Sequence, residues 1–211
     1  MPIDITKIDA IVFDLGGVLL NIDHQAPINA FKALGIPNFD QLYSKVNQTT
    51  LFTDFETGVI SPELFRDGLR AYLPVDLSDD VIDQAWNSII LNFPESRIRM
   101  LERLKTEYHL FLLSNTNINH FQVFNHRLKA NFGYGSLSEL MESTYYSHQL
   151  GLRKPNPAIF EHVLTDAQLN PMRTLFIDDT EEHILAAQAL GLQTHHLKED
   201  EEIVELLNLV K

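Results

Sequence analysis

The sequence predicts an α/β fold in which helices cover both faces of a mainly parallel β-sheet. Two observations lead to this prediction: short, continuous apolar runs recur along the 211 residues, and segments with helical periodicity lie between them. A short unbroken apolar run is typical of a strand that is buried on both faces. Strands that alternate with helices pair in parallel, because each helix carries the chain back to the same end of the sheet.

Five apolar runs are expected to form strands, and the periodic segments between them are expected to form helices. The strongest runs are residues 10–13, 110–113 and 175–177, and the weaker ones are 143–147 and 193–197. Helices are expected over residues 97–108, 158–164, 181–190 and 200–211. The second follows the start signal Pro155-Asn156-Pro157, and the third ends at Gly191, which suits a C-cap. The last begins at Asp200 and ends at Lys211, which complements the helix dipole.

Residues 22–94 break this alternation, because they carry helical patterns and no convincing strand. A helical block between the first two strands is an insertion into the sheet domain. Insertions at the carboxyl ends of parallel strands lie where ligands bind. We therefore expect a core made of residues 1–21 and 95–211 and an α-helical cap made of residues 22–94.

The composition excludes several classes of partner. The formal net charge of −13, from 29 acidic and 16 basic residues, repels nucleic acids and anionic membranes. A phosphate site would therefore need its own local positive charge. The absence of cysteine excludes disulfides, thiol catalysis and cysteine–zinc sites. No secretory signal and no run of ~18 apolar residues is visible, so we expect a cytoplasmic protein, as a monomer or homodimer.

Polar residues follow the first two strong strands. Asp14 comes directly after the first and is followed by Gly16 and Gly17, which allow a tight turn near a ligand. Asp14 can be a nucleophile, a ligand of a hard cation, or simply a helix cap. Ser114 and Asn115 follow the second strand, where a hydroxyl and free backbone amides can cradle a phosphate. Such residues also end many strands without any function.

Charged residues mark two later segments. Lys154 precedes a proline in a rigid loop and can project its ammonium into a site, a role for which Arg153 competes. The alternative is a solvated basic loop. Asp178 and Asp179 follow an apolar run, where paired carboxylates are costly unless a cation neutralises them. Oxygen ligands suit Mg²⁺, whereas the alternative is an acidic helix start.

These motifs gain force together, because the carboxyl ends of parallel strands meet at one edge of the sheet. They offer a nucleophile, a phosphate-oxygen donor, a cation and a metal site, which are the parts that phosphoryl transfer needs. Their order resembles that of the haloacid dehalogenase-like hydrolases, on the stretches Asp14 with Gly17-Val18-Leu19, Ser114-Asn115, Lys154-Pro155 and Asp178-Asp179. The chain is similar in particular to small bacterial sugar-phosphate phosphatases, which also share the stretch Phe55-Glu56-Thr57-Gly58.

The resemblance implies a three-layer Rossmann-like core, a small helical cap and a small phosphorylated metabolite as substrate. It implies that Asp14 attacks phosphorus and that Ser114, Asn115 and Lys154 hold the phosphoryl group. The implied ligands of Mg²⁺ are Asp14, the backbone carbonyl of Gly16 and Asp178. For Asp179 the resemblance implies that it binds the ion directly or through water, or that it pairs with Lys154.

Gly16 departs from the pattern of most phosphatases of this superfamily, which carry a second aspartate there as general acid and base. The similar sugar-phosphate phosphatases also have glycine at this position. Proton transfer by such a group is worth about 10²–10⁴-fold in rate, so its loss matters. A replacement is expected from Asp23 or His24 near the start of the cap, although both also suit a hinge or surface role.

Other readings stay open on the sequence. A metal-independent dehalogenase-type hydrolase also lacks the second aspartate, but it needs no acidic pair such as Asp178-Asp179. A phospho-acceptor signalling module is shorter and places its acidic pair early, whereas a catalytically silent metal-binding relative is harder to exclude. His120 and several residues of the cap have two possible roles: they contact the substrate, or they serve only in packing and turn formation. The cap residues are Phe52, Phe55, Glu56, Gly58, Phe65, Tyr72 and Trp86.

Overall fold

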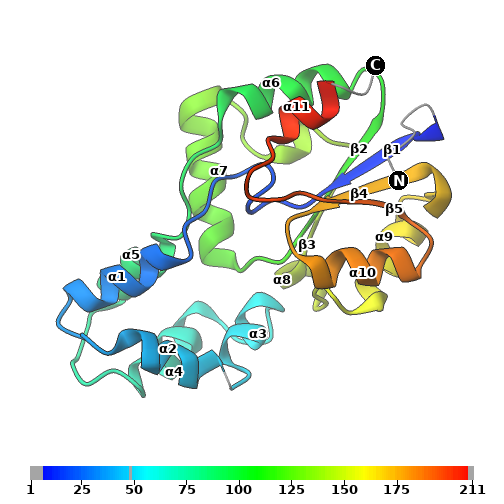
Figure 1. Cartoon of the computed structure of the whole chain (residues 1–211). Helices are drawn as coiled ribbons and strands as arrows, with labels where there is room; N and C mark the ends of the chain where they lie inside the picture. The colour runs from blue at the N-terminus through cyan, green and yellow to red at the C-terminus, as the bar shows by residue number, and fades with distance from the viewer. Residues whose placement is uncertain (1–6, 48, 209–211) are drawn as a thin grey trace.

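The computed structural model describes residues 7–47 and 49–208, and these contain a five-stranded sheet (Figure 1). In spatial order the strands are β3 (Ser143–Tyr146), β2 (His109–Ser114), β1 (Ala10–Phe13), β4 (Thr174–Asp178) and β5 (Gln193–His196). Every neighbouring pair is parallel, so the five carboxyl ends lie along one edge. The predicted α/β fold with a parallel sheet is confirmed.

Strand residues alternate between two hydrophobic clusters, one on each face of the sheet. In β1, Ile11 and Phe13 belong to one cluster, whereas Ala10 and Val12 belong to the other. The first face is covered by α6 (Glu95–Leu104), α7 (Ile118–Phe132) and α11 (Ile203–Asn208), and the second by α9 (Pro157–Asp166) and α10 (Glu181–Ala189) (Figure 1). Three short helices join these layers: η2 (Leu137–Glu139), α8 (Ser147–Leu150) and η3 (Pro171–Arg173).

Five further helices lie between β1 and β2 in the chain and share a third hydrophobic cluster. They are α1 (Gln25–Ala33), α2 (Phe39–Asn47), α3 (Leu51–Glu56), α4 (Pro62–Arg70) and α5 (Asp79–Asn87), set beside the sheet layers in Figure 1. Aromatic rings fill this cluster: Phe55 stacks on Phe65 at 4.1 Å between centroids, and Phe52 stacks on Trp86 at 5.1 Å. A core of its own is what an inserted helical unit needs to hold its shape.

Three helices differ from the sequence-based expectation. The first, α6, begins at Glu95 and ends at Leu104, four residues before the expected end at residue 108. The prediction omits α7, although end signals are present: the Asn117 side chain accepts a hydrogen bond from the His120 N–H, and Gly133 is left-handed at φ 84°. The last helix begins at Ile203 instead of Asp200, because the Glu201 N–H first closes a turn onto the Lys198 carbonyl. The predicted end of this helix, residue 211, lies outside the described residues.

Within residues 7–47 and 49–208, no helix combines the length and the apolar composition that a membrane crossing requires.

Candidate active site at the carboxyl edge of the sheet

Three aspartates meet where β1 and β4 end side by side. Because Phe13 pairs with Ile177 in the parallel register, Asp14 lies beside Asp178. The Asp14 N–H donates to the Ile177 carbonyl at 2.9 Å, which fixes this junction. Carboxylate oxygens of Asp14, Asp178 and Asp179 all lie within 4.8 Å of one another. The three aspartates at the ends of β1 and β4 therefore form a compact acidic cluster at the carboxyl edge of the sheet, as expected.

The fully buried Lys154 side chain reaches into this cluster. Its Nζ donates to Asp14 Oδ1 at 2.7 Å and to Asp178 Oδ2 at 2.6 Å. The Asn115 side chain holds the lysine backbone from both sides: its Nδ2 donates to the Lys154 carbonyl at 2.9 Å, and its Oδ1 accepts from the Lys154 N–H at 2.8 Å. Asn115 thus positions Lys154, which is an arrangement that the sequence did not indicate.

One ammonium faces three carboxylates, so the cluster carries excess negative charge. Burial raises the pKa of Asp14 to about 7, even though Lys154 pulls it down. Burial and the neighbouring Asp178 also raise the pKa of Asp179. Burial acts in the same direction on Asp178, but Lys154 and His183 outweigh it and lower its pKa. Oxygen donors with uncompensated charge fit a hard divalent cation such as Mg²⁺, which would relieve this repulsion.

Two histidines and a glycine complete the surroundings of the acidic pair. His183 Nδ1 lies 3.0 Å from both carboxylate oxygens of Asp178, and His196 Nε2 lies 3.0 Å from the Asp179 carbonyl. Gly17 is left-handed at φ 73°, and a Cβ there would lie 2.1 Å from Asp179 Oδ2. Glycine is therefore required at this position for the close approach of the loop to Asp179. Sequence reasoning missed both histidines. The signal for His183 is its place in the first turn of α10, five residues after Asp178 at the end of β4.

A pocket of about 190 Å³ opens between this edge and the helices of residues 22–94. Its lining from the sheet side includes Gly16, Ser114 and Asn115, three of the predicted site residues. Its lining from the inserted helices and their connections is His24, Tyr43, Glu56 and Trp86, with Ile22, Ile89 and Ile90. Asp23 is outside this lining: it is exposed, and its carboxylate accepts a hydrogen bond from the Gln25 N–H at 2.8 Å. The predicted site residues therefore fall into two adjoining sets, joined by the hydrogen bonds between Asn115 and Lys154. Asp14, Lys154, Asp178 and Asp179 form the charged cluster, Gly16, Ser114 and Asn115 line the pocket, and Asp23 belongs to neither set.

Comparison with known proteins agrees with this geometry. Residues 8–191 match the pattern of haloacid dehalogenase-like hydrolases. The chain belongs to this hydrolase family. A D-ribitol-5-phosphate phosphatase of Bacteroides thetaiotaomicron is 33% identical over 186 residues, which cover 87% of this chain and 89% of that protein.

Two further relatives of the family are informative. The crystal structure of the enzyme BT-2542 of Bacteroides thetaiotaomicron, in complex with magnesium and inorganic phosphate, has a TM-score of 0.83 and 36% identity over 94% of this chain and 98% of that one. A sesquiterpene phosphatase, astK, of Aspergillus oryzae is 27% identical over 199 residues, or 91% of each chain. The sequence-based resemblance to this family is confirmed.

The aromatic residues named from the sequence in the expected cap differ in their surroundings: some are buried in the third hydrophobic cluster, and one lines the pocket. Trp86 lines the pocket and stacks on His120 at 5.5 Å between ring centroids, whereas Phe55 and Phe65 are buried in the helical cluster and Tyr72 is exposed. Burial lowers the pKa of His120 to about 4, so the ring is neutral at pH 7. His120 therefore presents a neutral, packed surface to the pocket.

Acid should destabilise this hydrolase partly through His120. The pKa of this residue is about 4 in the native state, against an ordinary value of 6.5, so the unfolded chain binds more protons between these values. The stabilising contribution is present above pH ~6.5 and is lost as the pH falls toward 4. Between pH 7 and 4.5 the wild type should lose ~2 kcal/mol more unfolding free energy than His120→Gln, measured by urea denaturation. Equal losses would contradict the buried, neutral state of His120.

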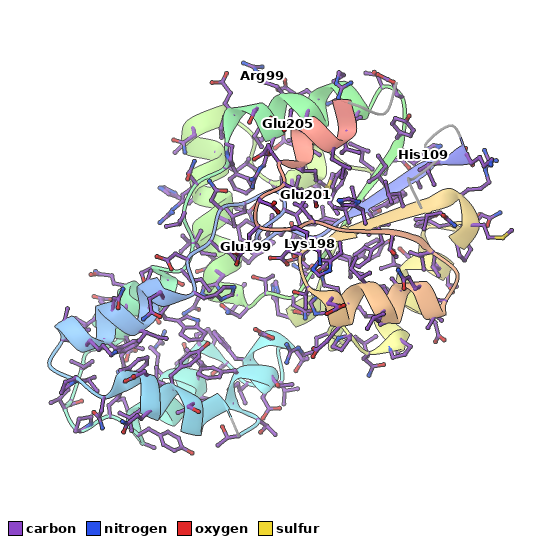
Figure 2. All side chains as sticks on the ribbon, viewed as in Figure 1. Arg99, His109, Lys198, Glu199, Glu201 and Glu205 are labelled. Carbon is purple, nitrogen blue, oxygen red and sulfur yellow. The ribbon has the colours of Figure 1, made fainter. Side chains whose placement is uncertain are left out.

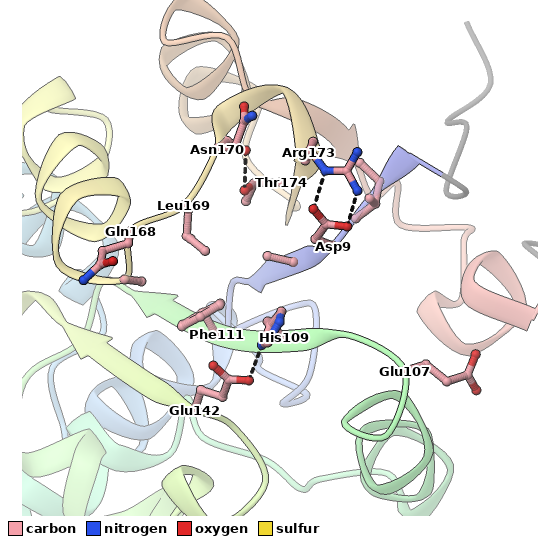
Figure 3. A pocket seen from close by; sticks show the side chains of 13 residues that line it. Asp9, Glu107, His109, Phe111, Glu142, Gln168, Leu169, Asn170, Arg173 and Thr174 are labelled. Atoms are coloured by element: carbon pink, nitrogen blue, oxygen red, sulfur yellow. Dashed lines mark hydrogen bonds and ion pairs between the residues drawn. The ribbon is translucent and has the colours of Figure 1, made fainter.

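A larger hollow of about 440 Å³ lies at the opposite edge of the sheet (Figure 3). Residues at the beginnings of the strands line this hollow. Figure 2 shows His109 at this amino-terminal edge of the sheet and Lys198 toward the carboxyl edge. Four of the hollow's charged or titratable side chains are paired within the lining, because Arg173 pairs with Asp9 and His109 pairs with Glu142. Ligands of doubly wound sheets bind at the carboxyl ends of the strands, so the smaller pocket is the candidate active site.

Proposed function

We propose that this chain is a Mg²⁺-dependent phosphatase that hydrolyses a small phosphate monoester, in particular a sugar phosphate, through an aspartyl-phosphate on Asp14. The observation that carries the proposal is the buried triad of Asp14, Lys154 and Asp178 beside a small pocket. Phosphoryl transfer depends on positioning and charge neutralisation more than on covalent chemistry, and these residues supply both. The phosphatases among its relatives support the same reaction class.

Each site residue has a role in this reaction. Asp14 is the nucleophile, and Lys154, Ser114 and Asn115 bind or position the phosphoryl group at the ends of the strands. The residues that would hold Mg²⁺ are Asp14, Asp178, Asp179 and the Gly16 carbonyl. The ion supplies positive charge that stabilises the phosphoryl oxygens. Splitting the hydrolysis through Asp14 lets water complete it in a second, easier step.

The size of the pocket supports a small substrate. Residues 22–94 act as the cap over a core of residues 1–21 and 95–211, and the space left between them is about 190 Å³. This space accommodates a compact polyol or sugar phosphate more readily than an extended chain. The ribitol phosphate on which one relative acts belongs to the same class of phosphorylated polyol.

The clustered carboxylates also weigh against the other functions. A metal-independent dehalogenase has no need for Asp178 and Asp179 beside its nucleophile, whereas a divalent cation explains why their charge is tolerated. A catalytically silent relative would hold the metal but release no phosphate. The test below separates these functions.

The proposed function is tested by phosphate release from an aryl phosphate and from a panel of sugar and polyol phosphates. We expect release with Mg²⁺, a fall of at least ~10²-fold after chelation with EDTA, and recovery when Mg²⁺ is added in excess. Metal-independent release would favour the dehalogenase-type alternative. No release from any substrate, by a protein whose thermal midpoint still rises with Mg²⁺, would favour the silent relative.

A further inference from the structure

Gly16 leaves the proposed reaction without a proton donor at the usual position, and the structure offers a carboxylate elsewhere. Asp23 is exposed and caps the start of α1 through the Gln25 N–H. Glu56, at the end of α3, lines the same pocket as Gly16, Ser114 and Asn115. An acid for the leaving oxygen has to face the pocket that receives the rest of the substrate, and Glu56 lines that pocket.

The backbone of Glu56 is fixed against the core at the edge of the pocket. Ser147 Oγ donates to the Glu56 carbonyl at 2.6 Å and accepts from the Thr116 N–H, in the loop after β2, at 2.9 Å. Two residues further on, a Cβ at Gly58 would lie 2.3 Å from the His148 carbonyl, so the chain here touches α8 backbone to backbone. These contacts leave Glu56 little freedom to move away from the site.

The side chain of Glu56 is held by the loop that carries Lys154. Its Oε2 lies 3.1 Å from an Arg153 guanidinium nitrogen, and Arg153 also donates to Thr53 Oγ1 at 3.1 Å. Among the residues that the structure describes, none makes a well-aligned hydrogen bond to Oε2, so its hydrogen-bonding capacity is not used up. Oε2 itself is buried, so the accessible 28% of the side chain belongs to its other atoms, through which Glu56 meets the pocket.

The surroundings of Glu56 favour its protonated form more than water does. Burial raises the pKa of the Glu56 carboxyl, although the positive charge of Arg153 and that of a protonated His183 pull it down. Enzymes raise the pKa of a carboxyl in this way so that it can deliver a proton near neutral pH.

We propose that Glu56 is the general acid and base of the reaction, in place of the missing side chain at position 16. This inference rests on the proposed phosphatase function. As an Asp14 oxygen bonds to phosphorus and the phosphorus–ester oxygen bond breaks, the Glu56 carboxyl gives its proton to the departing oxygen, which leaves as an alcohol. The Glu56 carboxylate then takes a proton from the water that attacks phosphorus, the Asp14–phosphorus bond breaks, and phosphate is released with both carboxyl groups restored.

The leaving group of the substrate distinguishes acid catalysis from a structural role. An alkoxide leaving group, as in a sugar or polyol phosphate, needs a proton, whereas a nitrophenolate leaves well without one. We expect Glu56→Gln to lower kcat for the best alkyl phosphate by about 10²–10³-fold and kcat for p-nitrophenyl phosphate by less than about 10-fold. Glu63→Gln, an equivalent change at an exposed position of α4, should leave both unchanged.

Three results would overturn the assignment of Glu56. One is an equal loss on both substrates, which indicates a structural role, and another is a rise in KM alone, which indicates substrate binding. The third is leaving-group dependence in Asp23→Asn and not in Glu56→Gln. Retained turnover of the aryl phosphate by Glu56→Gln shows that the site is folded. Failure of the wild type on every substrate would instead reject the phosphatase function itself.

Discussion

Asp14→Asn is expected to abolish phosphate release, with a fall in kcat of at least ~10⁴-fold on every substrate. The amide cannot attack phosphorus, and it also removes one charged oxygen from the cluster that would hold Mg²⁺. Shape is preserved, since asparagine is isosteric with aspartate and the lysine keeps its 2.6 Å bond to Asp178. The measurement is phosphate release at saturating Mg²⁺, compared with Asp76→Asn, an equivalent change at an exposed position.

The same substitution should not weaken the fold. Because burial raises the pKa of Asp14 from 3.8 to about 7, the ionised carboxylate is less favourable in the folded state than in the unfolded chain. Stability is therefore lost as the pH rises from about 4 to 7, and an uncharged amide escapes this loss. Without metal at pH 7.5, Asp14→Asn should melt at or above the wild-type temperature. A marked drop in its thermal midpoint would show that Asp14 serves the structure as well as the chemistry.

Lys154→Met is expected to damage both stability and activity. Lys154 is fully buried between Asp14 and Asp178, so its loss leaves two carboxylates without their cation. Removing one partner of a buried ion pair costs about 3–5 kcal/mol, because the remaining charge is desolvated and uncompensated. Urea denaturation in EDTA should show this loss, and kcat should fall by about 10²–10⁴-fold as the phosphoryl oxygens lose an ammonium.

Lys129→Met provides the matched control, because Lys129 is exposed in the last turn of α7. It should change the unfolding free energy by less than about 0.5 kcal/mol and leave kcat unchanged. Mg²⁺ should restore part of the stability of Lys154→Met, since a cation at the cluster replaces some of the lost positive charge. A stable Lys154→Met variant in EDTA would mean that Asp14 and Asp178 adapt by protonation, and that the lysine is not needed to hold the site together.

Taken together, these expectations describe a site in which stability is traded for reactivity. The buried Asp14 carboxylate is unfavourable in the absence of metal, and Lys154 compensates for only part of the charge. Such uncompensated charge is typical of functional sites, where binding of a ligand relieves it.

The local sequence was sufficient for the sheet and for most of the site. Continuous apolar runs at β1, β2 and β4 identify buried strands, and polar residues directly after them have to lie at the carboxyl edge. The parallel order of strands then brings Asp14, Ser114 and Asp178 together without further information. The omission of α7 has a local cause, since polar residues interrupt its apolar stripe and weaken the helical period.

The sequence by itself therefore determined the fold class and placed Asp14 and the acidic pair at strand ends, because strand periodicity and parallel topology are readable from neighbouring residues. The role of Asp14 as nucleophile came from the resemblance to the family. Only the tertiary structure decided that Lys154 is buried between Asp14 and Asp178, that Asp23 is exposed, and that Glu56 lines the pocket. These outcomes depend on how helices and loops distant in the chain pack against the sheet edge. That packing is set by the shapes of the separate hydrophobic clusters, and no local pattern reports it.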